Sequence, residues 1–140
     1  MATRHVTVRL DADVVGRLDA RSQSTERKRP ELITRYVDEG MRMEDHPGIV
    51  FRSGPAGRRA GLAAGPDVWE VMRVVRNVEG SGEAAVTEAA EWLSLAREQI
   101  DSAVRYYSEY PDEVDRWIDR VDEEARRAQQ IWQRRQDALA

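Results

Sequence analysis

Apolar and polar residues alternate strictly over the first stretch of the chain, Arg4–Asp11. The apolar side chains fall on one side: Val6, Val8 and Leu10. The polar side chains fall on the other: His5, Thr7 and Arg9. This period of two predicts a β-strand with one buried face. A lone strand leaves its backbone groups without partners, and no second strand of similar quality lies nearby.

The spacing of apolar residues then changes to that of two helices. Asp11 is a candidate cap for the first, whose apolar stripe is Val14, Val15 and Leu18. A polar connector is expected over Ser22–Lys28, and Pro30 fits the first turn of a second helix that runs to about Met43. Its apolar positions are Leu32, Ile33, Tyr36, Val37 and Met41. A unit of about 45 residues is too small to bury a core alone, so a symmetric dimer with paired strands is expected.

Glycine and proline punctuate the next segment, His46–Asp67. The stretches "IVFRS" and "RRAGLA" around "GPAG" predict a β-hairpin. The run "GPAGRRAGLAAG" also invites comparison with a phosphate-binding loop. It lacks the Gly-Lys-Ser/Thr ending of such loops, so the hairpin is favoured.

Helical spacing continues from Asp67 to the end of the chain. Three helices are expected first, the second ending at Leu93 and the third covering Ala96–Glu109, with a tight turn between them. A long helix follows over Pro111–Leu139. The predicted fold is therefore mainly α with a small β component. Its parts are a strand-helix-helix domain (1–45), a hairpin with a helix-turn-helix-like module (46–110) and a C-terminal helix (111–140).

The long helix has segregated charges and a heptad-like seam through Val114, Ile118, Val121, Ala125, Ala128, Trp132, Arg135 and Leu139. Its first half, Asp112–Glu124, holds seven acidic residues against Arg116 and Arg120. Its second half, residues 125–140, holds Arg126, Arg127, Arg134 and Arg135 against Asp137. This order complements the helix dipole.

Composition excludes several classes of function. The chain has no cysteine, which rules out disulfides and thiol catalysis. No apolar run approaches the length of a membrane span, and the first residues lack a signal core, so a cytoplasmic protein without membrane contact is expected. His46 has no metal-ligand spacing, and no catalytic constellation can be assembled, so neither a metal, a cofactor nor an enzymatic activity is predicted. The net charge of -4 argues against non-specific coating of DNA.

The segments "RHVTVRLDAD", "LDADVVGRLD" and "RPELITRYVDEG" resemble the ribbon-helix-helix family of DNA-binding proteins. The resemblance covers about residues 3–43. It implies an intertwined dimer whose paired strands enter the major groove, with His5, Thr7 and Arg9 as readers of base edges. The alternative is that these three side chains only solvate one face of a strand.

The resemblance also implies phosphate contacts at the start of the second helix. Pro30 stands where the family usually has a small polar residue with a backbone N–H, so Arg27, Lys28 and Arg29 are the candidate phosphate contacts. The alternative for these residues is a solvated connector.

Residues 46–120 resemble, more weakly, a small winged-helix domain found in prokaryotic antitoxins. Helix Ala96–Glu109 would take the place of the recognition helix, with Arg97, Gln99 and Arg105 exposed. Acidic neighbours would repel phosphates, so a packing or dimerisation module is favoured over a second DNA contact.

The overall order is similar to antitoxins of the VapB type, in which a DNA-binding head precedes a helical tail that wraps a toxin, often a PIN-domain ribonuclease. The resemblance implies partner-binding residues along the long helix: Trp117, Val121, Ala128, Trp132, Arg134 and Arg135. The two arginines would enter the acidic, metal-binding site of the toxin. The alternative is a coiled coil within the chain or its homodimer.

The sequence thus favours a dimeric or larger repressor that binds a palindromic operator in double-stranded DNA and neutralises a cognate toxin. The competing hypothesis is a structural or interaction protein whose modules only dimerise.

Overall fold

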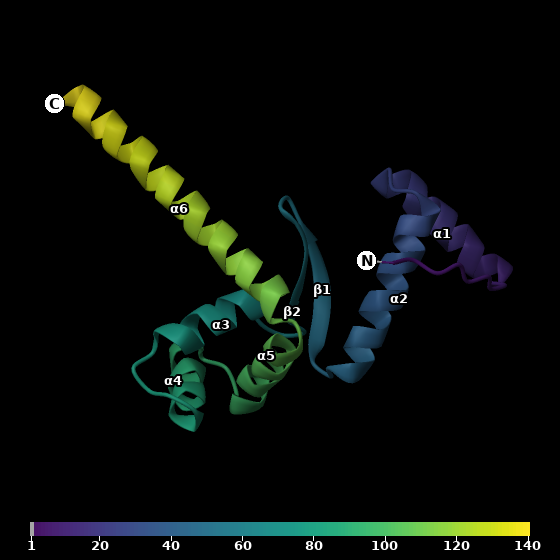
Figure 1. The fold of residues 1–140 in the computed structure, drawn as a ribbon, viewed down its shortest axis with the longest axis horizontal. Coiled ribbons are helices and arrows are strands. Elements are labelled where there is room, and N and C mark those ends of the chain that lie inside the picture. Colours follow the sequence, from purple (N-terminus) through teal and green to yellow (C-terminus); the bar gives the residue numbers. More distant parts are fainter. Residues whose placement is uncertain (1) are drawn as a thin grey trace. The chain divides into compact units, whose positions relative to one another are not determined.

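A computed structural model of the chain describes residues 2–140. These residues form six helices and one antiparallel two-stranded sheet (Figure 1). The prediction of a mainly helical fold with a small β-hairpin is confirmed. Two compact units make up the chain, residues 2–41 and residues 42–140.

The first unit contains helix α1 (Ala12–Thr25) and most of helix α2 (Arg29–Asp45). Asp11 occupies the N-cap position of α1, as predicted, but its side chain makes no capping hydrogen bond. The prediction of a connector from Ser22 is wrong in its first half, because α1 continues to Thr25. The Thr25 hydroxyl donates to the Arg21 carbonyl at 2.7 Å, which lets a polar residue remain in the last turn. The helix ends at Glu26, which takes a left-handed conformation with φ 56°.

Residues 2–11 form no regular secondary structure, so the strand predicted over Arg4–Asp11 is not present in the single chain. The physical reason is that a strand is stabilised by hydrogen bonds to a neighbouring strand. Both strands of the sheet lie in the second unit, where they pair with each other. The paired form of residues 4–11 stays a prediction.

The second unit begins with the predicted hairpin, which is confirmed as strands β1 (Ile49–Gly54) and β2 (Gly57–Leu62). Pro55 and Ala56 form the turn, and Gly57 follows with φ +122°, a value that favours glycine. Gly61 leaves space for a neighbouring side chain. A Cβ at this position would collide with the guanidinium of Arg52, which crosses the strand here.

Three helices follow the hairpin: α3 (Val68–Asn77), α4 (Glu83–Leu93) and α5 (Arg97–Glu109). Helix α3 contacts β2, α4 and α5, and α5 contacts both strands. Their shared core includes Ile49, Leu62, Val71, Ile100, Ala103 and Tyr106. The turn between α4 and α5 is tight, because Ser94 takes a left-handed conformation with φ 54°.

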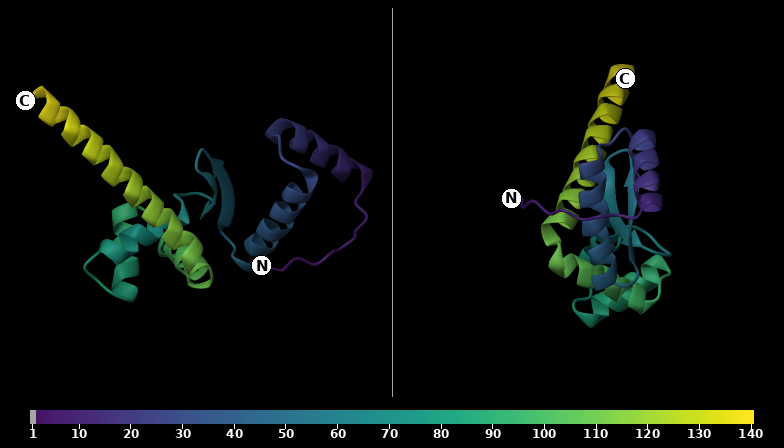
Figure 2. Two further views of the ribbon diagram at one scale, coloured as in Figure 1. Left: turned by 45° about the horizontal axis from the view of Figure 1, so that its top comes forward. Right: turned by 90° about the vertical axis from the view of Figure 1, so that its right-hand side faces the viewer.

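Helix α6 (Pro111–Leu139) packs on the second unit along only its first half. Val114 and Ile118 are buried, and α6 contacts α3 and α5. Every residue from Glu123 to Arg135 is exposed. The second half therefore projects beyond α3, α4 and α5 (Figures 1 and 2).

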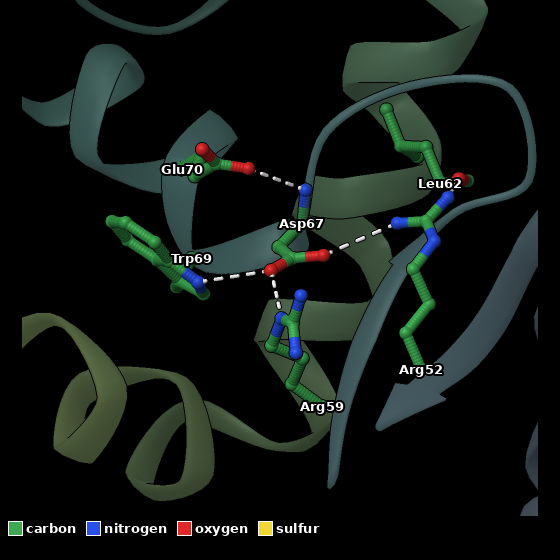
Figure 3. A network of polar contacts seen from close by, with 6 residues as sticks. All are labelled: Arg52, Arg59, Leu62, Asp67, Trp69 and Glu70. Carbon is green, nitrogen blue, oxygen red and sulfur yellow. Dashed lines mark hydrogen bonds and ion pairs between the residues drawn. The ribbon is translucent and has the colours of Figure 1, made fainter. Parts of the chain in front are cut away.

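A buried carboxylate, Asp67, connects the hairpin to α3 (Figure 3). Its side chain is paired with Arg52 at 3.1 Å and with Arg59, and it accepts a hydrogen bond from the Trp69 indole at 3.3 Å. Its backbone N–H donates to the Glu70 carboxylate at 2.8 Å, as at the start of a capped helix. Two arginines from the sheet and the first turn of α3 thus contact one residue, Asp67, which is 7% exposed.

A second polar cluster joins the last turn of α2 to α5 and α6. Arg42 donates to the Tyr106 hydroxyl and to the Glu113 carboxylate, both at 2.9 Å. Burial raises the pKa of Tyr106 and the neighbouring Glu113 carboxylate raises it further, which keeps the phenol protonated. Burial opposes the charge of Arg42, but the contacts with Tyr106 and Glu113 outweigh it and raise the pKa of the guanidinium.

We predict that Asp67→Ala destabilises residues 42–140 by about 3 kcal/mol, because it leaves two arginines without their counter-ion and removes a helix cap. All four tryptophans lie in this unit, so urea unfolding followed by tryptophan fluorescence measures the effect. Asp119→Ala, on an exposed position of α6, is the control and should change the free energy of unfolding little. Equal values for both variants would contradict the role given to Asp67.

Candidate nucleic-acid interface

The three predicted base readers lie on the exposed N-terminal segment. His5, Thr7 and Arg9 are all exposed, and the His5 Nε2 atom lies 3.0 Å from the Thr7 hydroxyl. Their side chains offer an imidazole, a hydroxyl with a methyl group, and a guanidinium. These are the groups that recognise base edges in the major groove.

The apolar side chains that alternate with the readers are exposed as well. Val6 is 77% exposed, Val8 64% and Leu10 44%. Helix α2 adds further exposed apolar residues: Ile33, Tyr36, Val37, Met41 and Met43. Within residues 2–41, the buried hydrophobic residues are Leu18 and Leu32. A single copy of this unit therefore leaves most of its apolar side chains in water, which marks an interaction surface.

The predicted phosphate contacts lie at the start of α2. Arg29 is paired with Asp19 at 3.2 Å and Arg27 with Glu31 at 3.9 Å, and each arginine side chain remains about half exposed. Lys28 is exposed. Glu31 occupies the first turn of α2, where a carboxylate interacts favourably with the helix dipole. Together with Pro30, which has no N–H, this carboxylate weakens the helix N-terminus as a phosphate site.

The exposed polar residues expected on α5 are mostly engaged with their own unit. Arg97 forms an ion pair with Glu83 and donates to the Thr87 hydroxyl. The Gln99 side chain accepts from the backbone N–H of Ala96 at 3.0 Å and donates to the Ala64 carbonyl at 3.2 Å. Arg105 is exposed. These contacts support the view that α5 packs the module rather than reads DNA.

The predicted partner-binding residues divide between the two halves of α6. Trp117 and Val121 are half-buried against the second unit, and Ala128, Trp132, Arg134 and Arg135 are exposed. Trp132 is 58% exposed. Sequence reasoning missed Ile131, which is also exposed, because it lies beside the heptad seam rather than on it.

Trp117 and Val121 line an open groove of about 510 Å³ between α6, the hairpin turn and the start of α3. The remaining lining residues include Pro55, Pro66, Trp69, Glu70 and Glu124, with Arg52, Arg59 and Asp67 at the network of Figure 3. No pattern in the sequence predicts this groove, because its walls come from three separate elements.

Other candidate chemistry is limited. His46 lies 2.6 Å from the Glu109 carboxylate and packs edge-on against Tyr106 and Tyr110. Among residues 2–140, no three histidine or acidic side chains are arranged to hold a metal ion. In the same residues, no helix combines the length and apolar character needed to cross a membrane.

Comparison of the chain with protein-family models, with curated proteins and with solved structures found no match.

Proposed function

We propose that the protein is a cytoplasmic, dimeric transcriptional repressor that binds operator DNA through residues 4–10. The observation that carries the proposal is the exposed N-terminal segment, in which apolar and polar residues alternate. Its apolar side chains are not covered by their own unit, and its polar side chains carry hydrogen-bonding groups.

Pairing two copies of this segment would resolve both features. Antiparallel strands would satisfy the backbone groups of residues 4–10 and place Val6, Val8 and Leu10 over the exposed face of α2. His5, Thr7 and Arg9 would then project together from the other face of the ribbon. A two-stranded ribbon fits the major groove, where Arg9 can bind guanine with two hydrogen bonds and Thr7 can contact a thymine methyl.

We propose further that the repressor is the antitoxin of a toxin–antitoxin pair and regulates its own operon. The exposed second half of α6 supports this part, because it joins apolar side chains to an excess of arginines. Trp132 would serve as the apolar anchor, and Arg134 and Arg135 would bind an acidic toxin site, with a PIN-type ribonuclease favoured.

Arg9→Ala is expected to lower the affinity for operator DNA by about 30-fold or more, because a symmetric dimer loses one specific contact in each half-site. The measurement is a gel-shift titration on the DNA that precedes the reading frame of the protein. Thr7→Ala should weaken binding in the same assay.

Arg17→Ala is the control, since it removes the same charge from an exposed position on α1. Equal losses for Arg9→Ala and Arg17→Ala would show general attraction to phosphates and overturn the proposed base reading.

Hydrogen exchange tests strand pairing directly. The backbone amides of residues 5–10 should exchange slowly in the native protein, because the ribbon would hold them in hydrogen bonds. Ile33→Gln/Val37→Gln should speed their exchange by about 100-fold, since it removes two apolar side chains from the shared core. Arg35→Gln places the same amide on the opposite face of α2 and should preserve protection. Fast exchange in the native protein would rule out the ribbon.

Binding of a toxin is tested by co-expression with the product of the adjacent reading frame. A stable complex is expected, and Arg134→Glu/Arg135→Glu should weaken it by about 10-fold or more, because two charges facing an acidic site are reversed. Arg105→Glu, on exposed α5, should leave the complex intact. An unchanged complex in the double variant would place the toxin contact elsewhere.

A further inference from the structure

We propose that, in the absence of another partner, the exposed half of α6 lies antiparallel in the groove of a second copy of the chain. In this reciprocal contact, residues 125–139 of each copy pack beside Trp117 and Val121 of the other. The inference goes beyond the proposed function, since it assigns an occupant to the groove and a second self-contact to the protein. It does not depend on DNA binding.

The exposed half of α6 and the open groove both leave apolar side chains in contact with water. Residues 123–139 would extend about 25 Å from the packed part of the second unit. A helix of that length without tertiary contacts is marginal in water. Ion pairs along it, such as Arg126 with Glu123 at 2.7 Å, contribute only a few tenths of a kcal/mol each. An apolar contact along the helix is therefore the missing source of stability.

The groove and the tail share one stripe of α6. Trp117, Val121 and Glu124 line the groove, and the same stripe of α6 continues at helical spacing through Ala128 and Ile131. The open groove and the exposed tail thus form one continuous surface. The stripe that lines the groove in one copy continues into the tail that enters the groove of the other copy. A two-fold axis across α6 therefore makes the two tail-in-groove contacts equivalent.

Charge decides the orientation. Residues 111–124 of α6 carry seven acidic and two basic residues, whereas residues 125–140 carry four basic and one acidic. Three of the acids, Glu113, Asp115 and Asp122, form ion pairs with arginines outside α6. Glu123 and Glu124 form ion pairs with arginines of α6 itself. The remaining residues of the first half are still net acidic. A parallel pair would place like charges together, whereas an antiparallel pair places each basic half on an acidic half.

An apolar match gives the register. Placing Ile131 of one copy opposite Val121 of the other sets Ala128 opposite Glu124 and Arg135 opposite Trp117. Arg127, which pairs with Glu123 of its own helix at 3.4 Å, then also lies beside the Glu124 carboxylate of the other copy. The indole of Trp117 already has the Arg120 guanidinium 5.6 Å from its ring, so it accepts cationic neighbours.

Cysteine cross-linking tests this arrangement cleanly, because the native chain contains no cysteine. Full-length Val121→Cys and Ile131→Cys chains are unfolded, mixed, refolded and oxidised. The expected product is a disulfide between the two different chains. Each variant alone should give little product, since like positions would lie about 15 Å apart in an antiparallel pair. Ser108→Cys on α5 replaces Val121→Cys in the control mixture.

A charge swap tests the orientation independently. Arg127→Glu, added to both cysteine chains, should lower the cross-linked fraction by about tenfold, because it sets two carboxylates together. Adding Glu124→Arg to the same chains should restore it. Circular dichroism checks that every variant keeps its helices.

Two outcomes overturn the proposal: self-linked Ile131→Cys, which indicates a parallel pair, and no link in the mixture. Either result leaves the ribbon untouched, since protection of residues 5–10 and the effect of Arg9→Ala are measured separately. Loss of those two effects with the cross-link intact would instead reject the proposed DNA-binding function alone.

Discussion

The second unit depends on one buried carboxylate, Asp67, which holds the sheet and the helices in a fixed relation. Arg52 and Arg59 extend from the two strands and meet it, and Trp69 reaches it from α3. Two cations facing one another across a small hairpin would repel without this anion. The hairpin and α3 meet here, α5 packs on both of them, and the first half of α6 packs on α3 and α5. The second unit thus completes its own core.

Residues 2–41 bury much less apolar surface in the single chain. Their buried hydrophobic side chains are two leucines, while the apolar side of the N-terminal segment and the outer face of α2 lie in water. Each large apolar side chain left exposed forgoes about 1.5–3 kcal/mol of burial, which is a large fraction of what stabilises a small domain. This contrast shows where apolar surface remains exposed in the single chain. It lies at the two ends of the chain, on the N-terminal segment with α2 and on the second half of α6.

Most elements of the fold could be predicted from local patterns, since helical spacing and turn residues act over short distances. The hairpin was predicted from "GPAG", and α6 from its apolar seam with Pro111 in its first turn. The end of α1 was predicted incorrectly, because Ser22–Thr25 are polar residues that helices tolerate when their hydroxyls bond to the preceding turn. The strand predicted over Arg4–Asp11 is absent from the single chain for a different reason. Its pattern specifies a conformation that requires hydrogen bonds from outside the same chain. The Asp67 network and the groove could not be predicted, because both arise where separate elements meet.

The two proposed contacts of α6, one with a second copy and one with a toxin, bear on the regulation of toxin binding. A contact that covers the basic half of α6 must supply carboxylates together with an apolar surface. The acidic first half of a second α6 meets this condition, and so would the acidic site of a toxin. The two partners would use the same tail residues and could not occupy one helix at the same time. Release of the α6 pair would then accompany capture of the toxin, and the affinity observed for a toxin would be lower than the intrinsic value by the stability of the pair.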